Sequence, residues 1–340
     1  MILVTGGTGL VGSHLLYNLA SNKKKVRAIY RREHKLDTVK KVFSYYTEHS
    51  ESLFNFIEWV EANLTDITAL TNAFKEVTHV YHCAAFVSFE PDKYHQLRKI
   101  NIEGTANIVN LCVSHNIKKL CYISSIAAIG HHANYEKLIT EDTHWNTEDD
   151  NSVYAITKYG AEIEVWRGTQ EGVDAVIVNP GIIVGPGFWK GAGSSSLIRL
   201  IYKGVPYYTN GSTGYVGVWD VASVMQQLME SNIKNEGFIL VSDNLTFKNF
   251  IYKVANALKV KPTKKKASAF LLELGWRLDW LRHKLTGKRR QLSKHTAKSA
   301  RQRTLYDNSK IKNALDFQFT PIDEVIEKTS KLFLDDIKKD

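Results

Sequence analysis

The 340-residue chain is 44% hydrophobic and 24% charged, which is typical of a folded globular protein and excludes a largely disordered one. Its net charge is +10, and none of its three cysteines lies in a CxxC pair, so we expect neither a zinc site nor a disulfide framework. We find no run of about 18 uncharged apolar residues and hence predict no integral membrane span. Because the first apolar strand begins at Ile2, we expect a cytoplasmic protein.

The first half of the chain alternates short apolar runs with longer amphipathic stretches. The apolar runs predict strands over residues 2–5, 26–30, 56–60, 80–84, 119–124 and 175–179. Helical spacing predicts helices over 12–21, 69–76 and 101–115. Strands that alternate with helices predict an α/β fold with a doubly wound parallel sheet and right-handed crossovers.

A glycine-rich turn directly follows the first predicted strand. Gly6, Gly9 and Gly12 form a GxxGxxG pattern between an apolar strand and an amphipathic helix. The first glycine permits a tight turn, the second lets the backbone approach a pyrophosphate, and the third lets helix and strand pack closely. The amino end of the helix presents unpaired N–H groups to the anion. The pattern predicts a Rossmann dinucleotide site with contacts from Gly6, Thr8, Gly9, Leu10, Val11 and Gly12.

Beyond Asp243 the alternation ends, and helical spacing predicts helices over 247–258, 267–285 and 323–334. We expect a smaller, mostly helical C-terminal lobe over the carboxyl ends of the strands, where doubly wound sheets bind ligands. The expected dinucleotide-binding domain covers residues 1–180 with a return segment at about 211–245, and the expected substrate lobe covers about 181–210 and 246–340.

The end of the second predicted strand distinguishes NADP from NAD. An NAD site usually has an acidic residue here that holds the ribose hydroxyls. This chain has Tyr30-Arg31-Arg32 and no acid before Glu33. A guanidinium binds a 2′-phosphate in a bidentate manner, whereas a carboxylate repels it. We therefore predict NADP rather than NAD, with Arg31 as the first candidate and Arg32 as the second; the alternative is a pair of solvated surface arginines.

A YxxxK spacing marks the candidate catalytic helix. Tyr154 and Lys158 share one helix face at i and i+4. A tyrosine with an unperturbed pKa of about 10 is a poor base at neutral pH, and a nearby ammonium lowers that pKa. Tyr154 is therefore the expected acid–base catalyst. The strand over 119–124 ends in Ser124-Ser125, and we expect one of these serines to polarise the substrate oxygen.

Together these motifs resemble the extended short-chain dehydrogenase/reductase superfamily, and within it the dihydroflavonol-reductase-like and 3β-hydroxysteroid-dehydrogenase-like members. The resemblance covers nearly the whole chain. It rests on the segments 5–12, 26–31, 82–85, 101–105, 122–125 and 179–186. The chain departs from the family at Asn63, where an Asp is usual, and near Gly181, where Thr or Tyr is common.

The resemblance implies roles for individual residues. Ser125 rather than Ser124 is the catalytic serine, and Lys158 contacts the ribose. Asn101 either holds a water of a proton relay or packs the helix that contains it. Further cofactor contacts are implied for Tyr154, Lys158, Asn63, Leu64, Ala84, Ala85, Pro180 and Ile183.

The implied reaction is hydride transfer between NADPH and the carbonyl or alcohol carbon of a small molecule. A nucleotide-sugar epimerase or dehydratase that recycles its cofactor is the first alternative. A non-catalytic NADP-binding regulator is the second. The family also implies a homodimer, and nothing in the spacing of ligand-type residues predicts a metal site.

The segment 253–303 holds sixteen Lys or Arg and two acids, so the rest of the chain carries a net charge of −4. Such an excess fits an anionic partner or a solvated basic face. Aromatic residues are sparse among the cations, so we expect no nucleic-acid partner. Leu272, Trp276, Trp280 and Leu281 predict a lobe helix with a buried stripe; the alternative is an interfacial helix that makes weak peripheral membrane contact.

Overall fold

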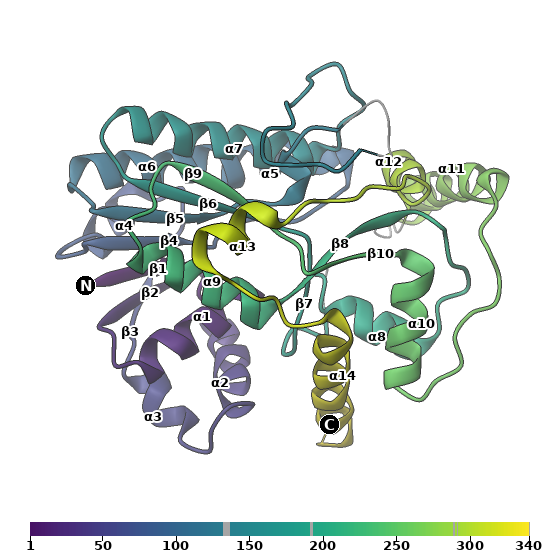
Figure 1. Ribbon diagram of the computed structural model, residues 1–340, viewed down its shortest axis with the longest axis horizontal. Coiled ribbons are helices and arrows are strands. Elements are labelled where there is room, and N and C mark those ends of the chain that lie inside the picture. Colours follow the sequence, from purple (N-terminus) through teal and green to yellow (C-terminus); the bar gives the residue numbers. More distant parts are fainter. Residues whose placement is uncertain (132–136, 191–192, 288–289, 291, 340) are drawn as a thin grey trace.

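The computed structural model describes residues 1–131, 137–190, 193–287, 290 and 292–339. Figure 1 shows a large sheet between two layers of helices, and beside it a smaller lobe that contains the C-terminal helices.

The large sheet has seven strands in the order β3-β2-β1-β4-β5-β6-β9, and every pairing in it is parallel. The strands are β1 (Ile2–Thr5), β2 (Val26–Tyr30), β3 (Glu58–Glu61), β4 (His79–His82), β5 (Lys119–Ile123), β6 (Ala175–Pro180) and β9 (Glu236–Leu240). All six predicted strands are present within two residues of their expected bounds, and the doubly wound α/β fold is confirmed. The strand order reverses between β1 and β4, which is where this fold binds dinucleotides.

Two helical layers cover the faces of this sheet. One layer comprises α1 (Leu10–Ser21), α2 (Leu36–Ser44), α3 (Ser50–Asn55) and α9 (Val218–Glu230). The other comprises α4 (Ile67–Ala73), α5 (Tyr94–Leu97), α6 (Gly104–Ser114) and α7 (Val153–Gln170). A π-helical turn over Arg98–Glu103 joins α5 to α6, and short 3₁₀ turns lie at Glu33–Lys35, Pro91–Lys93 and Ile126–Ala128. The apolar strand residues alternate between the two cores, as expected for a sheet covered on both sides.

The smaller lobe contains a three-stranded sheet of β7 (Ile182–Val184), β8 (Ser212–Gly217) and β10 (Asp243–Thr246), in the order β10-β8-β7. The sequence did not predict these strands, nor β9 of the large sheet. The later helices are α8 (Ser196–Lys203), α10 (Phe247–Ala257), α11 (Ala269–Thr286), α12 (Lys294–Ser299), α13 (Ser309–Leu315) and α14 (Ile322–Lys339). The expected helical C-terminal region is thus confirmed. None of the helices in the described ranges is both long enough and apolar enough to cross a bilayer.

Parallel pairing brings the carboxyl ends of β1 to β6 to one edge of the large sheet. The glycine turn, the two arginines and the serine pair each follow one of these strands. The fold therefore collects at one edge the motifs that the sequence spreads over its first 180 residues.

Candidate active site

The glycine turn lies against the segment that follows β4. Gly6 has a φ of +68°, and a Cβ added to it would lie 2.5 Å from the backbone nitrogen of Ala84. A Cβ on Gly12 would collide with the carbonyl oxygen of Gly6. Gly9 caps α1 without a side-chain acceptor, so the first N–H groups of the helix are left to another acceptor. This bare cradle at a helix amino end fits a pyrophosphate.

The other predicted cofactor residues lie along the same edge. Arg31 and Arg32 follow β2 and are exposed, and within the described part of the chain neither guanidinium is paired with a carboxylate. Asn63 follows β3 and is exposed, whereas Leu64 is buried against Gly104, where a Cβ would lie 2.9 Å from the Leu64 Cβ. The remaining predicted contacts lie in or beside the turn, after β4, or in β6 and β7: Thr8, Leu10, Val11, Ala84, Ala85, Pro180 and Ile183.

Tyr154 meets Ser125 at the carboxyl end of β5. Ser152 caps α7, its hydroxyl accepting a hydrogen bond from the Ala155 backbone N–H at 3.0 Å, which places Tyr154 in the first turn. The half-buried Tyr154 side chain lies beside Ser125, and its ring meets Phe89 edge-on at 5.3 Å between centroids. Burial raises the pKa of Tyr154 to about 12, and the nearby Ser125 hydroxyl opposes this rise.

Lys158 is buried below Tyr154 on the same helix. Its ammonium donates to the Tyr122 hydroxyl at 2.6 Å and to the Ile123 carbonyl oxygen at 2.9 Å. Burial lowers the pKa of Lys158 to about 7, while the Glu162 carboxylate opposes this fall. The expectation that this ammonium lowers the pKa of Tyr154 is wrong for this structure. The Lys158 side chain reaches across to β5, and burial is the largest influence on the pKa of the Tyr154 hydroxyl.

Glu162 extends the polar face of α7 by one turn and is not among the site residues predicted from the sequence. Its carboxylate accepts hydrogen bonds from the Ser124 hydroxyl at 2.6 Å and from the Asn179 amide at 2.9 Å. The Asn179 amide also donates to the Ser125 carbonyl oxygen at 3.1 Å. Burial raises the pKa of Glu162. The signal was present in the sequence, because Glu162 lies four residues after Lys158 and so shares its helix face.

Asn101 holds two segments of the site together. It lies in the π-helical turn, a feature frequent at functional sites. Its Oδ1 accepts from the Phe86 backbone N–H at 2.7 Å, and its Nδ2 donates to the Phe86 carbonyl oxygen at 3.0 Å and to Thr157 Oγ1 at 3.2 Å. These bonds connect the segment after β4 to α7. Of the two roles left open for Asn101, the structure shows the packing contacts.

A buried histidine joins β1, β4 and the central helix beneath the site. The Thr5 hydroxyl lies 2.6 Å from His82 Nδ1, and the Thr105 hydroxyl lies 2.9 Å from His82 Nε2. Burial lowers the pKa of His82 to about 3, so the ring is neutral at physiological pH. It stacks on Tyr122, the acceptor of the Lys158 bond. Across the described residues, no three His, Cys, Asp or Glu side chains gather as a metal would need.

Comparison with known proteins identifies the family. Residues 2–240 match the NAD dependent epimerase/dehydratase family. A putative dihydroflavonol 4-reductase of Synechocystis sp. is 28% identical over 253 residues, 73% of this chain and 69% of that protein. The tetraketide alpha-pyrone reductase 2 of Arabidopsis thaliana is 29% identical over 255 residues, 72% of this chain and 78% of that protein. The UDP-glucose 4-epimerase of Vibrio cholerae is 30% identical over 214 residues, 60% of this chain and 58% of that protein.

Solved structures match the whole fold. The crystal structure of gox2253 aligns with a TM-score of 0.81 at 24% identity and covers 99% of this chain and 98% of its own. The UDP-glucose 4-epimerase of Thermotoga maritima, solved with UDP-glucose, aligns with a TM-score of 0.74 at 18% identity and covers 99% of both chains. With its fold, its glycine cradle and a family match over residues 2–240, the chain belongs to the NAD dependent epimerase/dehydratase family, within the extended short-chain dehydrogenases/reductases, and is an NAD(P)-dependent enzyme.

Proposed function

We propose that the protein is a reductase that moves a hydride between NADPH and the carbonyl or secondary alcohol carbon of a small molecule. The observation that carries this proposal is the pairing of Tyr154 with Ser125 at the sheet edge that also holds the glycine turn. In this proposal the dinucleotide-binding domain spans residues 1–180 with a return segment at about 211–245, and the substrate lobe spans about 181–210 and 246–340.

The protonation chemistry follows from the side chains present. NADPH supplies the hydride when it is bound. Tyr154 gives its proton to the substrate oxygen, and Ser125 donates a hydrogen bond that stabilises the developing negative charge on that oxygen. Lys158, with a pKa lowered to about 7, is partly charged at neutral pH, and in this proposal it contacts the ribose of the bound cofactor. Burial keeps Tyr154 protonated until the transfer.

The cofactor preference rests on the two arginines after β2. Both are exposed and, among the described residues, are free of carboxylate partners, so a 2′-phosphate would displace no existing ion pair. A charge-assisted bidentate bond to a phosphate contributes more than a neutral one. We assign the 2′-phosphate to Arg31 first and to Arg32 second, and the adenine edge to Asn63.

A nucleotide-sugar epimerase or dehydratase is the second candidate, favoured by the 30% identity with the Vibrio cholerae epimerase. An assay with aldehydes, ketones and UDP-glucose separates the two. A reductase oxidises NADPH stoichiometrically with at least one carbonyl compound, and NADH supports it poorly. Conversion of UDP-glucose without net use of added cofactor would contradict the reductase proposal. Binding of NADPH with no turnover in either assay would favour the non-catalytic regulator. The homodimer and the cytoplasmic location stay predictions.

A further inference from the structure

The lobe helix α11 has two apolar faces, and the described residues of the chain cover one of them. The Ser268 hydroxyl caps it by accepting from the Leu271 backbone N–H at 3.1 Å, and Gly287, with a φ of +64°, ends it. The covered face packs on α12 through a small cluster of Leu272, Ala267 and Ala297. Figure 1 shows α11 at the outer edge of the lobe, beside α12.

The opposite face carries five large apolar side chains, which we call the outer stripe. They recur every three or four residues and so share one helix face, with exposed fractions of 42% to 76%: Phe270, Leu274, Leu278, Leu281 and Leu285. Leu272 points the other way. An apolar stripe that faces water reverses the usual pattern of a surface helix and marks an interaction surface.

The predicted lobe helix is present, but the buried stripe expected on it is right for two of its four residues and wrong for the other two. Leu272 is buried and Trp276 is half-buried, but Trp280 and Leu281 are 43% and 47% exposed. The expected spacing mixed residues from two faces. When a helix has apolar residues on two sides, the sequence pattern fits two possible buried faces. The packing against α12 determines which face is covered.

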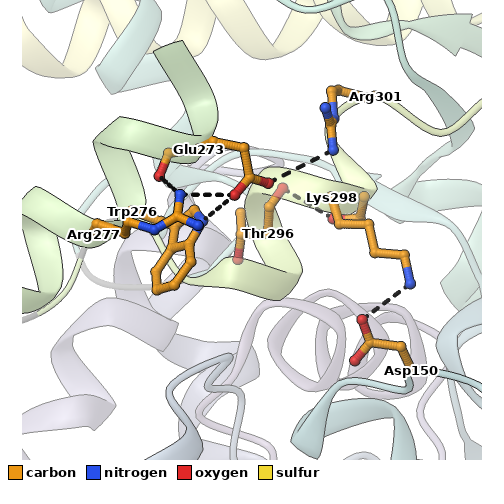
Figure 2. Close-up of polar contacts among 8 residues, drawn as sticks. Asp150, Glu273, Trp276, Arg277, Thr296, Lys298 and Arg301 are labelled. Carbon is orange, nitrogen blue, oxygen red and sulfur yellow. Dashed lines mark hydrogen bonds and ion pairs between the residues drawn. The ribbon is translucent and has the colours of Figure 1, made fainter. Parts of the chain in front are cut away.

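The charges around the outer stripe are cationic, because both acids of the segment are engaged by arginines. Figure 2 shows Glu273, whose carboxylate accepts from Arg277 and from the Trp276 indole at 3.0 Å each and lies 3.8 Å from Arg301. Asp279 is paired with Arg282 at 2.6 Å. The segment 253–303 keeps an excess of 14 positive charges. Lys284 lies over the exposed Trp280 ring at 4.7 Å, and Lys264, Lys265 and Lys266 stand exposed just before the helix.

We propose that α11 is a membrane-surface anchor whose outer stripe enters the interface of an anionic lipid bilayer. An interfacial helix combines an apolar face with cations that bind lipid headgroups, and each cation near an anionic surface adds to the affinity. The helix lies on the bilayer and does not cross it, because its five charged side chains make it too polar for a span: Glu273, Arg277, Asp279, Arg282 and Lys284. A second copy is the poorer occupant, because docking two such helices would oppose two strongly basic segments.

The anchor is tied to the segment that leads into the proposed catalytic helix. Lys298 of α12 binds Asp150 at 3.0 Å, two residues before Ser152, the cap of α7 (Figure 2). Docking would therefore bring the entrance to α7 close to the lipid. The anchor itself depends only on α11 and does not rest on the reductase proposal.

Vesicle flotation of the full chain tests the outer stripe. We expect binding to phosphatidylcholine vesicles that contain about 30% phosphatidylglycerol and little binding to phosphatidylcholine alone. The double variant Leu278→Gln/Leu281→Gln should bind at least about tenfold more weakly, because it removes two apolar side chains from the lipid. The matched control Phe56→Gln/Ile67→Gln removes two side chains of similar exposure, 49% and 58%, from the other part of the molecule and should bind as the parent does.

A second pair of variants tests the charge. Lys264→Gln/Lys265→Gln/Lys266→Gln should weaken binding about tenfold or more, and added salt should weaken the parent protein in the same way. Lys23→Gln/Lys24→Gln/Lys25→Gln removes the same charge elsewhere and should change binding less than about twofold. Equal losses in both charge variants, or no vesicle binding by the parent, would overturn the anchor. So would a stripe variant that dissociates a dimer while its vesicle binding stays intact. Turnover of a water-soluble carbonyl substrate should be unchanged in every variant, so failure of the anchor and failure of the reductase proposal give different results.

Discussion

The helices α7 and α11 have the same length and the same kind of N-cap, but they place polar and apolar side chains on opposite sides. Each spans 18 residues and begins with a serine cap, Ser152 in one and Ser268 in the other. The proposed catalytic helix α7 turns ionisable side chains inward, toward β5. The lobe helix α11 turns apolar side chains outward, toward solvent. Both break the rule that polar groups face water and apolar groups face the core, and such breaks concentrate at functional sites.

The two departures are stabilised differently. Burying Lys158 costs free energy that its bonds to Tyr122 and Ile123 offset within the protein, and Ser124 and Asn179 do the same for Glu162. The outer stripe of α11 has no such partner within the described residues. The comparison teaches that one helix completes its contacts inside the chain, whereas the other needs a surface outside it.

The largest expected effect tests the inward face of α7. Tyr154→Phe removes the proton that the substrate oxygen receives, so carbonyl reduction should fall by about a thousandfold. NADPH binding, measured by fluorescence titration, should change little. Tyr159→Phe is the matched control, because Tyr159 lies on the same helix but stacks on Trp145. Unchanged turnover in Tyr154→Phe would contradict the proposal that Tyr154 donates the proton.

The next largest effect tests whether the cofactor bound near the inward face of α7 is NADPH, with its 2′-phosphate on Arg31. Arg31→Ala should weaken NADPH binding by about 10- to 100-fold, because a charge-assisted bidentate bond is lost. NADH binding should stay within about twofold, since NADH has no 2′-phosphate for Arg31 to bind. Lys35→Ala is the control for a cation lost from the same exposed segment. Equal weakening of both cofactors would contradict the assignment of the 2′-phosphate to Arg31.

A smaller effect tests the coupling between Glu162 and Lys158. The Glu162 carboxylate raises the pKa of Lys158 against the lowering by burial, so Glu162→Gln should let Lys158 lose its proton at lower pH. The alkaline fall of kcat/KM should move to lower pH, with about a tenfold loss near pH ~8 and little loss near pH ~6. Glu164→Gln, which removes the carboxylate that pairs with Arg167, should leave the profile in place. A uniform loss at every pH would assign Glu162 a purely structural role.

Six of the seven strands of the large sheet were predicted from short apolar runs, whereas β9 (Glu236–Leu240) was not predicted. A strand such as Lys119–Ile123 is buried along its whole length, and the glycine turn and Pro180 bound the series. The small sheet was not predictable. β7 (Ile182–Val184) has only three residues, and β10 (Asp243–Thr246) is half-buried and rich in polar residues, so no alternation marks either strand. Its pairing with β8 is set by the tertiary fold.

The motifs of the site were predictable, but the contacts among them were not. Spacing places Tyr154 and Lys158 on one helix face. It does not say that Lys158 reaches Tyr122 on another element, or that burial raises the pKa of Tyr154 to about 12. Those facts depend on how closely α7 packs on β5, which a single sequence does not contain. The role of Asn101 was open for the same reason.

The smallest expected effect tests whether the ion pair between Lys298 and Asp150 couples the lobe to α7. Lys298 and Asp150 are both about half exposed, so Lys298→Ala should lower the free energy of unfolding by less than about 1 kcal/mol in urea titrations. Lys298 lowers the pKa of Asp150, so this contribution is present above the unfolded pKa of Asp150 and is lost as pH falls through its lowered folded pKa. Lys310→Ala, which breaks a comparably exposed pair with Glu236, is the control. Turnover and vesicle binding should both stay within about twofold of the parent protein. A selective loss of turnover in Lys298→Ala would mean that the lobe positions α7. Membrane docking through α11 could then change the activity of the site on α7.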